Sequence, residues 1–257
     1  MNVESGKVIH RGSPQSGIIV ADDGCRRNLY LDGGTLQSSM LLDDPDRLDL
    51  EYSQAMMCVL LLRPPPEKVL LVGLGGGSLV KFLLEFCPDA EIDVAEINPE
   101  VAGVAREYFL LPTSRRLQIT LSPGEEVVAE RLAAGARYDL LLLDAFDEQG
   151  PARALLEEQF LLHCRELLTA DGIFAMNLWN RPQDNFPSIF SRLTAVFGKG
   201  TRKLILPKTN TNAIVFGLSR PIRGNQLMKL KPAARGLSQR TGINFVRLLR
   251  QLYWQNT

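Results

Sequence analysis

Between residues 69 and 178 the chain alternates short, continuous apolar runs with amphipathic segments, and this alternation constrains its fold most strongly. Apolar runs of this length are typical of parallel strands in a sheet that helices cover on both faces. Segments of helical period fit between them, so the pattern predicts a doubly wound α/β domain. The predicted strands are Val69–Val72, Glu91–Ile97, Leu117–Leu121, Tyr138–Asp144 and Ile173–Leu178, with helices at about 78–87, 99–109, 124–134 and 153–168.

The segment that follows predicts how the sheet closes. Phe186–Phe197 has a helical pattern, and two strand candidates, Arg202–Leu206 and Ala213–Leu218, are joined across Pro207–Asn212. A closing antiparallel hairpin is expected of nucleoside-sulfonium transferases, whereas nicotinamide-binding Rossmann domains usually finish with a parallel strand. We therefore expect a mostly parallel seven-stranded sheet of the S-adenosylmethionine-dependent methyltransferase type.

The chain divides into three predicted parts. Short extended runs at Gly17–Ala21 and Asn28–Asp32, broken by turn residues, indicate a small N-terminal β subdomain. A helical stretch at about 48–62 leads into the sheet-forming part, and an amphipathic helix is expected at Ile243–Trp254. The predicted parts are a β-hairpin subdomain at 1–50, a Rossmann-like nucleoside-binding catalytic domain at 51–222 and a basic helical extension at 223–257.

Composition excludes several classes of protein. With 45% hydrophobic and 23% charged residues, the chain is neither disordered nor collagen-like. Its longest uncharged apolar run, Ala55–Leu62, has eight residues, far fewer than the roughly 20 of a membrane-spanning helix. The four cysteines lie 33, 29 and 77 positions apart with no C-x-x-C pair, which disfavours a zinc site or a disulfide framework. We expect a cytoplasmic protein with no membrane segment, no metal and ordinary buried thiols.

The net charge is zero but unevenly distributed. Residues 185–257 hold 13 Lys and Arg and no Asp or Glu, so residues 1–184 hold the other 16 basic and all 29 acidic residues. The two parts therefore carry charges of +13 and −13. The favoured interpretation is that the two parts pack together and neutralise each other. The alternatives are that the basic part binds an anionic partner such as RNA, or that the acidic part attracts a cationic small molecule.

A glycine-rich turn follows the first predicted strand of the sheet. Gly73, Gly75, Gly76 and Gly77 lie within five positions between that strand and a helix. Glycine permits a sharp turn and close approach of a ligand to the backbone, and the helix N-terminus adds N–H donors. Glu96 ends the next strand, 23 residues beyond Gly73, where a carboxylate can accept both ribose hydroxyls of a nucleoside. Turn and acid predict a nucleoside site without choosing among NAD, S-adenosylmethionine and related sulfonium compounds.

Two carboxylates, Asp144 and Asp147, follow the fourth apolar strand. In this architecture ligands bind at the carboxyl ends of the strands, so both side chains are expected to face the nucleoside crevice. There they can hold an ammonium group and accept the proton that an amine must lose before it attacks a carbon beside a sulfonium sulfur. The competing interpretation is that either aspartate caps the following turn or helix.

With these motifs the chain resembles the polyamine aminopropyltransferases, the spermidine and spermine synthase family, over about residues 13–220. Asp144-x-x-Asp147 followed by Gly150-Pro151-Ala152 is similar to the D-S-S-D-P-x-G-P-A signature and is the most specific match. The other matches are Leu31-Asp32-Gly33 with Gln37 to L-D-G-x-x-Q, Tyr52 to the tyrosine of Y-H-E, Val69–Gly77 to V-L-I-I-G-G-G-D-G, and Glu96-Ile97 to V-E-I-D.

The resemblance implies a role for each matched position. Asp144 would be the general base, and Asp147 would hold the amine substrate together with Tyr52 and Gln37, while Gln37 would also line the donor site. The donor, decarboxylated S-adenosylmethionine, would meet Gly73, Gly75, Gly76, Gly77, Glu96, Gly124, Glu125 and Pro151, with Glu96 on the ribose. Because members of this family often dimerise, the resemblance also implies a homodimer.

The chain departs from the family at positions that contact the substrates. The family's glycine turn contains an aspartate that holds the aminopropyl amine, and this chain has Gly76 there. The family's adenine-reading G-D-G is replaced by Ser122-Pro123-Gly124, with Glu125 the nearest acid. A carboxylate at position 76 would repel the carboxylate of ordinary S-adenosylmethionine, so its loss removes a discriminator in favour of the decarboxylated donor.

The favoured interpretation is a spermidine synthase-like aminopropyltransferase, in which a polyamine-type amine displaces methylthioadenosine from decarboxylated S-adenosylmethionine. The alternatives are a methyltransferase of the same fold that uses S-adenosylmethionine and a catalytically silent nucleoside-binding homologue. A nicotinamide enzyme is the least favoured.

Overall fold

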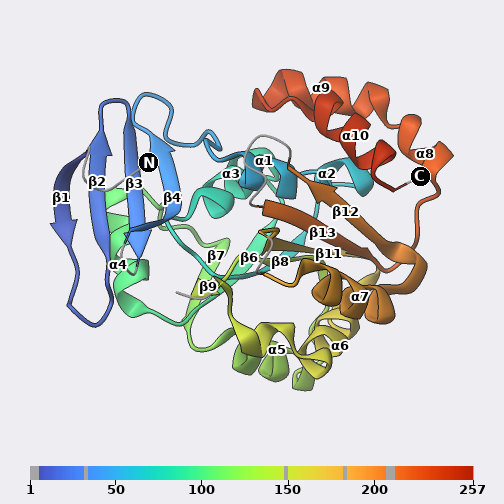
Figure 1. The fold of residues 1–257 in the computed structure, drawn as a ribbon, viewed down its shortest axis with the longest axis horizontal. Coiled ribbons are helices and arrows are strands. Elements are labelled where there is room, and N and C mark those ends of the chain that lie inside the picture. Colours follow the sequence, from blue (N-terminus) through green and yellow to red (C-terminus); the bar gives the residue numbers. More distant parts are fainter. Residues whose placement is uncertain (1–5, 32–33, 148–149, 182–183, 207–211, 257) are drawn as a thin grey trace.

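The computed structural model describes residues 6–31, 34–147, 150–181, 184–206 and 212–256, which are dominated by two sheets and their flanking helices (Figure 1). The larger sheet has seven strands in the order β12-β13-β11-β8-β5-β6-β7. The strands from β11 to β7 are parallel to their neighbours, and β13 is antiparallel to both β11 and β12. The predicted mostly parallel seven-stranded sheet is therefore confirmed. Its strands are β5 (Lys68–Val72), β6 (Glu91–Glu96), β7 (Leu117–Leu121), β8 (Tyr138–Leu143), β11 (Leu168–Trp179), β12 (Thr201–Ile205) and β13 (Asn212–Leu218).

Helices cover both faces of the larger sheet (Figure 1). One face packs against α5, α6 and α7 in a core that includes Leu141, Phe160 and Leu193. The opposite face packs against α3, α4 and the helices before β5 and after β13, in a core that includes Phe82 and Leu248. The helices between the strands are α3 (Ser78–Phe86), α4 (Pro99–Tyr108), α5 (Gly124–Ala133), α6 (Glu158–Glu166) and α7 (Phe186–Phe197).

A local sequence signal accounts for the start of α4. Asn98 caps α4, because its side-chain oxygen accepts the Glu100 N–H at 2.9 Å and Pro99 occupies the first helical position. The predicted helix at about 48–62 is divided by non-helical residues at 57 and 58 into α1 (Glu51–Met56) and α2 (Val59–Leu62). The predicted helix at 153–168 is likewise divided, with a 3-10 turn, η2 (Arg153–Leu156), before α6.

The N-terminal sheet has four antiparallel strands in the order β1-β2-β3-β4, which is larger than the predicted hairpin. The strands are β1 (Lys7–Arg11), β2 (Ile19–Asp23), β3 (Arg26–Leu31) and β4 (Thr35–Leu41). The sheet is tied to α4, since the Ser16 hydroxyl donates to the Glu100 carboxylate at 2.6 Å and an Arg27 guanidinium N–H donates to the Tyr108 carbonyl at 3.0 Å. These contacts fix the ends of β3 and β4 beside the larger sheet.

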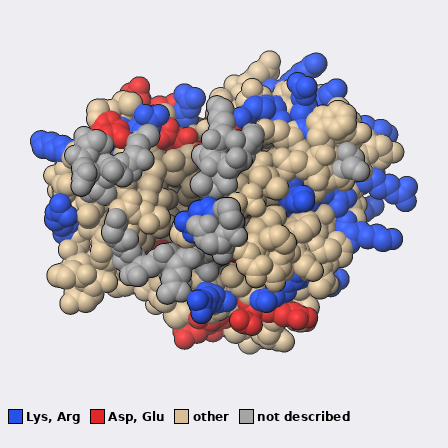
Figure 2. Space-filling model, in the orientation of Figure 1, with Lys and Arg blue, Asp and Glu red and all other residues tan. Residues whose placement is uncertain are grey.

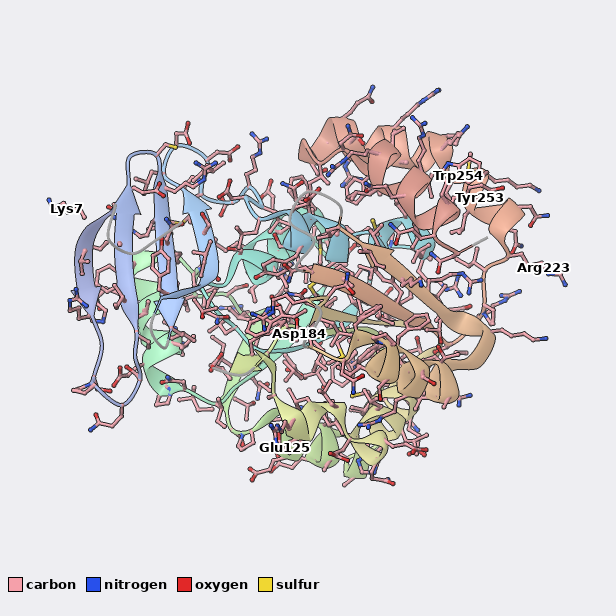
Figure 3. The ribbon with its side chains drawn as sticks, in the orientation of Figure 1. Lys7, Glu125, Asp184, Arg223, Tyr253 and Trp254 are labelled. Carbon is pink, nitrogen blue, oxygen red and sulfur yellow. The ribbon has the colours of Figure 1, made fainter. Side chains whose placement is uncertain are left out.

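The C-terminal part forms α8 (Gly224–Met228), α9 (Lys231–Thr241) and α10 (Phe245–Trp254). The predicted amphipathic helix is present, and α10 buries Phe245, Leu248, Leu249 and Leu252. Figure 2 shows Lys and Arg gathered over these helices, and Figure 3 places Arg223, Tyr253 and Trp254 there, far from Lys7 of β1. Ion pairs to the acidic part include Arg247 with Glu51 at 2.8 Å and, just before α8, Arg220 with Asp171 at 3.7 Å.

Three further observations bear on the class of the protein. Within the described ranges, no helix is both long and apolar enough to cross a bilayer. No cluster of three or more His, Cys, Asp or Glu side chains in the described part of the chain is arranged to hold a metal ion. All four cysteines are unpaired, and Cys58, Cys87 and Cys164 are buried as expected. Cys25 is exposed, because it lies at the turn between β2 and β3.

Candidate functional site

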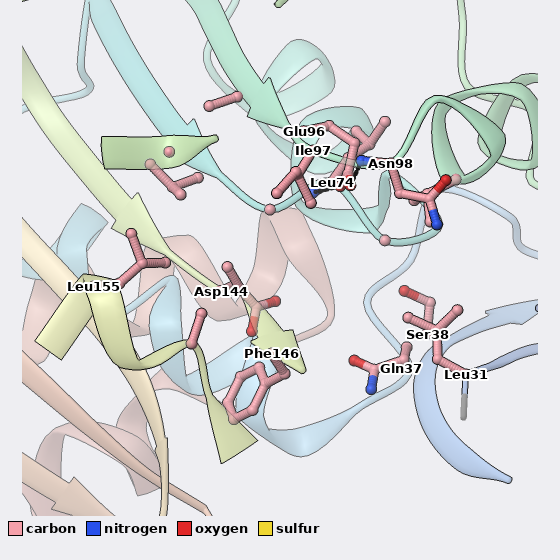
Figure 4. Close-up of a pocket in the computed structure, with 18 of the residues that line it drawn as sticks. Leu31, Gln37, Ser38, Leu74, Glu96, Ile97, Asn98, Asp144, Phe146 and Leu155 are labelled. Atoms are coloured by element: carbon pink, nitrogen blue, oxygen red, sulfur yellow. Dashed lines mark hydrogen bonds between the residues drawn. The ribbon is translucent and has the colours of Figure 1, made fainter. Parts of the chain in front are cut away.

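A cavity of about 680 Å³ lies where the carboxyl ends of β5, β6 and β8 meet the end of the N-terminal sheet (Figure 4). Its volume is within the range of small-molecule sites. In a parallel sheet of this kind, strand ends and the loops after them supply the ligand-binding groups. Eight residues predicted from the sequence line this one cavity: Gln37, Tyr52, Gly73, Gly75, Glu96, Gly124, Glu125 and Asp144.

The glycine turn brings the end of β5 against the end of β8. Gly73 has a φ of +92°, and a Cβ atom there would lie 2.3 Å from the Asp144 carbonyl oxygen. The Asp144 N–H in turn donates to the Val72 carbonyl at 2.9 Å. No side chain fits at position 73, so the glycine is what allows Asp144 to lie directly beside the turn.

Glu96 is fixed at the end of β6 by backbone groups on both sides. One carboxylate oxygen accepts the Leu74 N–H at 2.9 Å, and the other accepts the Asn98 N–H at 2.8 Å. Glu96 is only 7% exposed, and burial raises the pKa of its carboxyl although the backbone N–H groups oppose the rise. Each oxygen keeps a second lone pair, so the carboxylate can still accept hydroxyl donors from a ligand in the cavity.

Asp144 points into the cavity on the same side as Gln37 (Figure 4). One carboxylate oxygen accepts the Asn177 side-chain N–H at 2.9 Å. Burial raises the pKa of Asp144 to about 6, and the hydrogen bond from Asn177 and the neighbouring Tyr52 hydroxyl limit the rise. The carboxylate is therefore mostly ionised at neutral pH and has an affinity for protons that suits a general base.

Tyr52 extends from α1 toward Asp144. Its hydroxyl donates to the Gln37 backbone carbonyl at 3.1 Å. Burial and the neighbouring Asp144 carboxylate raise the pKa of the Tyr52 phenol well above its ordinary value. Tyr52 is therefore a neutral hydrogen-bonding group beside the carboxylate at physiological pH.

Two of the predicted glycines, Gly76 and Gly77, are not among the residues that line the cavity. A Cβ atom at Gly76 would lie 2.9 Å from the Phe109 ring and 3.0 Å from the Ser38 Cβ. A Cβ atom at Gly77 would lie 2.7 Å from Leu111. Both glycines therefore serve the packing of the turn, and the Gly76 N–H donates to the Ser38 hydroxyl at 2.8 Å.

Some motif residues lie outside the described part of the chain. The side chains of Asp147 and Pro151 are among them, although their backbones form the two-residue strands β9 (Phe146–Asp147) and β10 (Gly150–Pro151). Asp32 and Gly33 of the L-D-G segment are also outside the described residues. Their predicted roles remain predictions.

Among the residues at the site that were not predicted are Ser38, Phe146 and Asn177. Ser38 lines the cavity between Gln37 and Gly75, and Phe146 lines it beside Asp144. The Phe146 ring stacks on Trp179 with centroids 5.3 Å apart. Asn177 is 3% exposed and bonds directly to Asp144. The sequence held a signal for Asn177, which is the one polar residue in the run 173–178, because a buried polar side chain needs a partner.

Comparison with known proteins supports one family. A family model described as a spermine/spermidine synthase domain matches residues 50–183. The chain is 36% identical to the polyamine aminopropyltransferase of Neisseria meningitidis serogroup A over 248 residues, which are 95% of this chain and 91% of that protein.

Two solved structures are also similar. One is human methyltransferase-like protein 13 in complex with SAH, with a TM-score of 0.66 and 28% identity over 78% of this chain and 93% of that one. The other is spermidine synthase from Thermotoga maritima, with a TM-score of 0.66 and 21% identity over 87% of this chain and 78% of that one. The second likeness concerns the fold alone.

Proposed function

The chain belongs to the spermine/spermidine synthase family, and from this membership we propose that its cavity holds decarboxylated S-adenosylmethionine beside a polyamine-type amine. The chain is a transferase of the polyamine aminopropyltransferase type. The donor, the acceptor and the roles of individual residues are the parts that the proposal adds.

The observation that carries the proposal is the position of Asp144. Its carboxylate lines the same cavity as Glu96 and the glycine turn, and its pKa is raised to about 6. An amine substrate is protonated at neutral pH and must lose a proton before its lone pair can attack carbon. A partly buried carboxylate with this pKa can attract the ammonium group and accept that proton.

The proposed step is a displacement at the carbon beside the sulfonium sulfur. The amine lone pair forms the new C–N bond, the C–S bond breaks, and its electron pair stays on sulfur in neutral methylthioadenosine. The proton leaves the amine for Asp144 and then passes to solvent. No metal is needed in this step, because the positive sulfur is already an activated leaving group and positioning supplies much of the rate.

The other cavity residues are proposed to position the two substrates. Glu96 accepts the ribose hydroxyls, and Gly73 and Gly75 allow the nucleoside to approach the backbone. Tyr52 and Gln37 lie on the acceptor side, next to Asp144. Glu125 and Gly124 line the adenine side, while the roles of Asp147 and Pro151 rest on the sequence motif.

A second candidate is methyl transfer from S-adenosylmethionine, favoured by the lack of a carboxylate at position 76. Gly76 carries no carboxylate, and Phe109 and Ser38 fill the space that a side chain there would need. A donor that keeps its own carboxylate meets no negative charge from this position. The likeness to a human methyltransferase in complex with SAH supports the same candidate. Because of this crowding, Gly76→Asp would disturb the packing and is not a clean test of donor choice.

Calorimetry with four nucleosides separates the candidates: decarboxylated S-adenosylmethionine, S-adenosylmethionine, methylthioadenosine and NAD. We expect binding of the decarboxylated donor and of methylthioadenosine, and release of methylthioadenosine when a diamine is added to the donor complex. Preference for S-adenosylmethionine, with the methyl group transferred and SAH released, would establish the second candidate instead. If none of the four nucleosides binds, the proposed site is overturned. Preference for NAD would point to a dehydrogenase.

A further inference from the structure

Asn177 is a buried polar side chain near the carboxyl end of β11, in a run, Ile173–Leu178, that is otherwise apolar. It lies on β11 between Met176 and Leu178, and all three are at most 3% exposed. Burying an amide without partners costs about 1–3 kcal/mol in proteins, so an apolar residue would be favoured there on packing grounds alone. The bonds that the Asn177 side chain makes therefore indicate what it does.

Both ends of the Asn177 amide are engaged. Its N–H donates to a carboxylate oxygen of Asp144 at 2.9 Å. Its carbonyl oxygen accepts the side-chain N–H of Asn212 at 3.0 Å. Asn212 lies on β13, Asn177 on β11 and Asp144 just after β8, and these three strands are neighbours in the sheet. A continuous chain of hydrogen bonds thus crosses three strand ends and finishes on the carboxylate in the cavity.

The order of donors and acceptors in this chain is fixed. The ionised Asp144 oxygen can only accept, so the Asn177 amide must present its nitrogen to the carboxylate and its oxygen to Asn212. A bond from Asn212 to that oxygen selects this orientation and polarises the Asn177 N–H toward Asp144. Neither amide titrates near neutral pH, so the chain can orient the carboxylate without competing for its proton.

We propose that Asn177, oriented by Asn212, is a positioning residue that holds one oxygen of Asp144 so that the carboxylate faces the amine substrate. This proposal rests on the proposed function, in which Asp144 accepts the proton of the amine. Asn177 itself touches neither substrate nor donor, since it does not line the cavity. Its contribution is to fix the geometry of the base and to stabilise its ionised form.

The groups that face Asp144 determine how removal of the Asn177 side chain changes the pKa of Asp144. Asn177 from β11 donates to the carboxylate, Tyr52 from α1 lies beside it with its hydroxyl on the Gln37 carbonyl, and burial acts against its charge. Tyr52 remains neutral because the pKa of its phenol is raised. Loss of the Asn177 donor leaves burial less opposed, so the pKa of Asp144 must rise further. A merely structural role for Asn177 would change stability without moving this pKa.

The test uses Asn177→Leu, which keeps a similar volume and removes both hydrogen bonds, and Asn177→Asp, which places a second carboxylate against Asp144. The carboxyl of Asp144 is titrated by NMR in the unliganded protein, and kcat and the KM values for the diamine and for the donor are measured from pH 5 to 9. We expect Asn177→Leu to raise the pKa of Asp144 by about one pH unit and to lower kcat about 10- to 100-fold, with little change in the KM of the donor. Asn177→Asp should raise the pKa further, and Asn212→Ala should shift it in the same direction by less.

Thr201→Val is the matched control, because Thr201 is a buried polar residue of the same sheet whose hydroxyl donates to Leu193, away from Asp144. It should leave the titration of Asp144 unchanged. An unchanged Asp144 pKa in folded Asn177→Leu overturns the proposal, whether or not activity falls. If the pKa of Asp144 is raised in Asn177→Leu but neither this variant nor the wild-type protein transfers an aminopropyl group, the positioning role is upheld and the proposed function fails. Where Asn177→Leu does not fold, Asn212→Ala supplies the same decision.

Discussion

Asp144→Asn is expected to make the protein more stable while removing its activity. Burial raises the pKa of Asp144 from 3.8 to about 6, so the ionised carboxylate is less favourable in the folded chain than in the unfolded one. This difference corresponds to about 3 kcal/mol at pH values above both pKa values. An asparagine carries no charge and can still accept the Asn177 N–H, so the variant should recover an appreciable part of that free energy. Turnover should fall at least about 100-fold, because no general base remains.

The pH dependence gives this prediction its sign. A raised folded pKa means that the folded state binds more protons than the unfolded state between about pH 4 and pH 6, so wild-type stability contributed by Asp144 increases as pH falls. The stability advantage of Asp144→Asn is therefore largest at pH 7.5, up to about 3 kcal/mol, and shrinks to about 1 kcal/mol at pH 4.5.

Urea unfolding of both proteins at these two pH values measures the advantage. Asp89→Asn, at an exposed position, is the control and should change the free energy of unfolding by less than about 0.5 kcal/mol. A variant no more stable than wild type at pH 7.5, or an advantage that does not shrink on acidification, would refute the reasoning.

Two further predictions concern the turn and the ribose site. Gly73→Ala should lower the free energy of unfolding by about 3 kcal/mol or more, because its Cβ atom would lie 2.3 Å from the Asp144 carbonyl oxygen at a positive φ. The control is Gly103→Ala in α4, whose Cβ atom would meet nothing within 4 Å. It should raise the free energy of unfolding by up to about 1 kcal/mol. Thermal and urea unfolding of the pair check this, and equal effects would contradict the packing described for the turn. Glu96→Gln replaces one acceptor by an NH2 group facing a backbone N–H donor, so the affinity for methylthioadenosine measured by calorimetry should fall about tenfold or more. Unchanged affinity would remove Glu96 from the ribose site.

The sequence predicted which acidic side chains lie at the strand ends, because side-chain type and strand order are sufficient to place them at the carboxyl edge of the sheet. An apolar strand followed by Glu96 or Asp144 must deliver that carboxylate to the carboxyl edge of a parallel sheet, and both residues line the cavity. The same logic failed for Gly76, since glycine spacing indicates a turn but does not say which α-carbon faces the ligand. Phe109 and Leu111, which pack behind the turn, are more than 30 residues from it in the chain.

The N-terminal sheet shows another limit. Strands β2 and β3 overlap the predicted extended runs 17–21 and 28–32, whereas β4 reads Thr-Leu-Gln-Ser-Ser-Met-Leu and has no regular alternation. Its polar side chains are used at the site: the Ser38 hydroxyl accepts the Gly76 N–H, and Gln37 lines the cavity. Residues selected for contacts across the interface between the two sheets do not display the periodicity of either sheet.

The order of strands and helices, the glycine turn and the identities of the two acids at the strand ends were determined by the linear sequence, because each depends on residues close together in the chain. The tertiary structure decided which of these groups share a cavity, that Gly76 packs against Phe109, and that Asn212, Asn177 and Asp144 form one line of hydrogen bonds. Asn177 follows Asp144 by 33 residues and Asn212 follows Asn177 by 35, so only the pairing of β8, β11 and β13 brings them together. The pKa of Asp144 depends on that assembled surrounding, since burial and hydrogen bonding are properties of the folded chain.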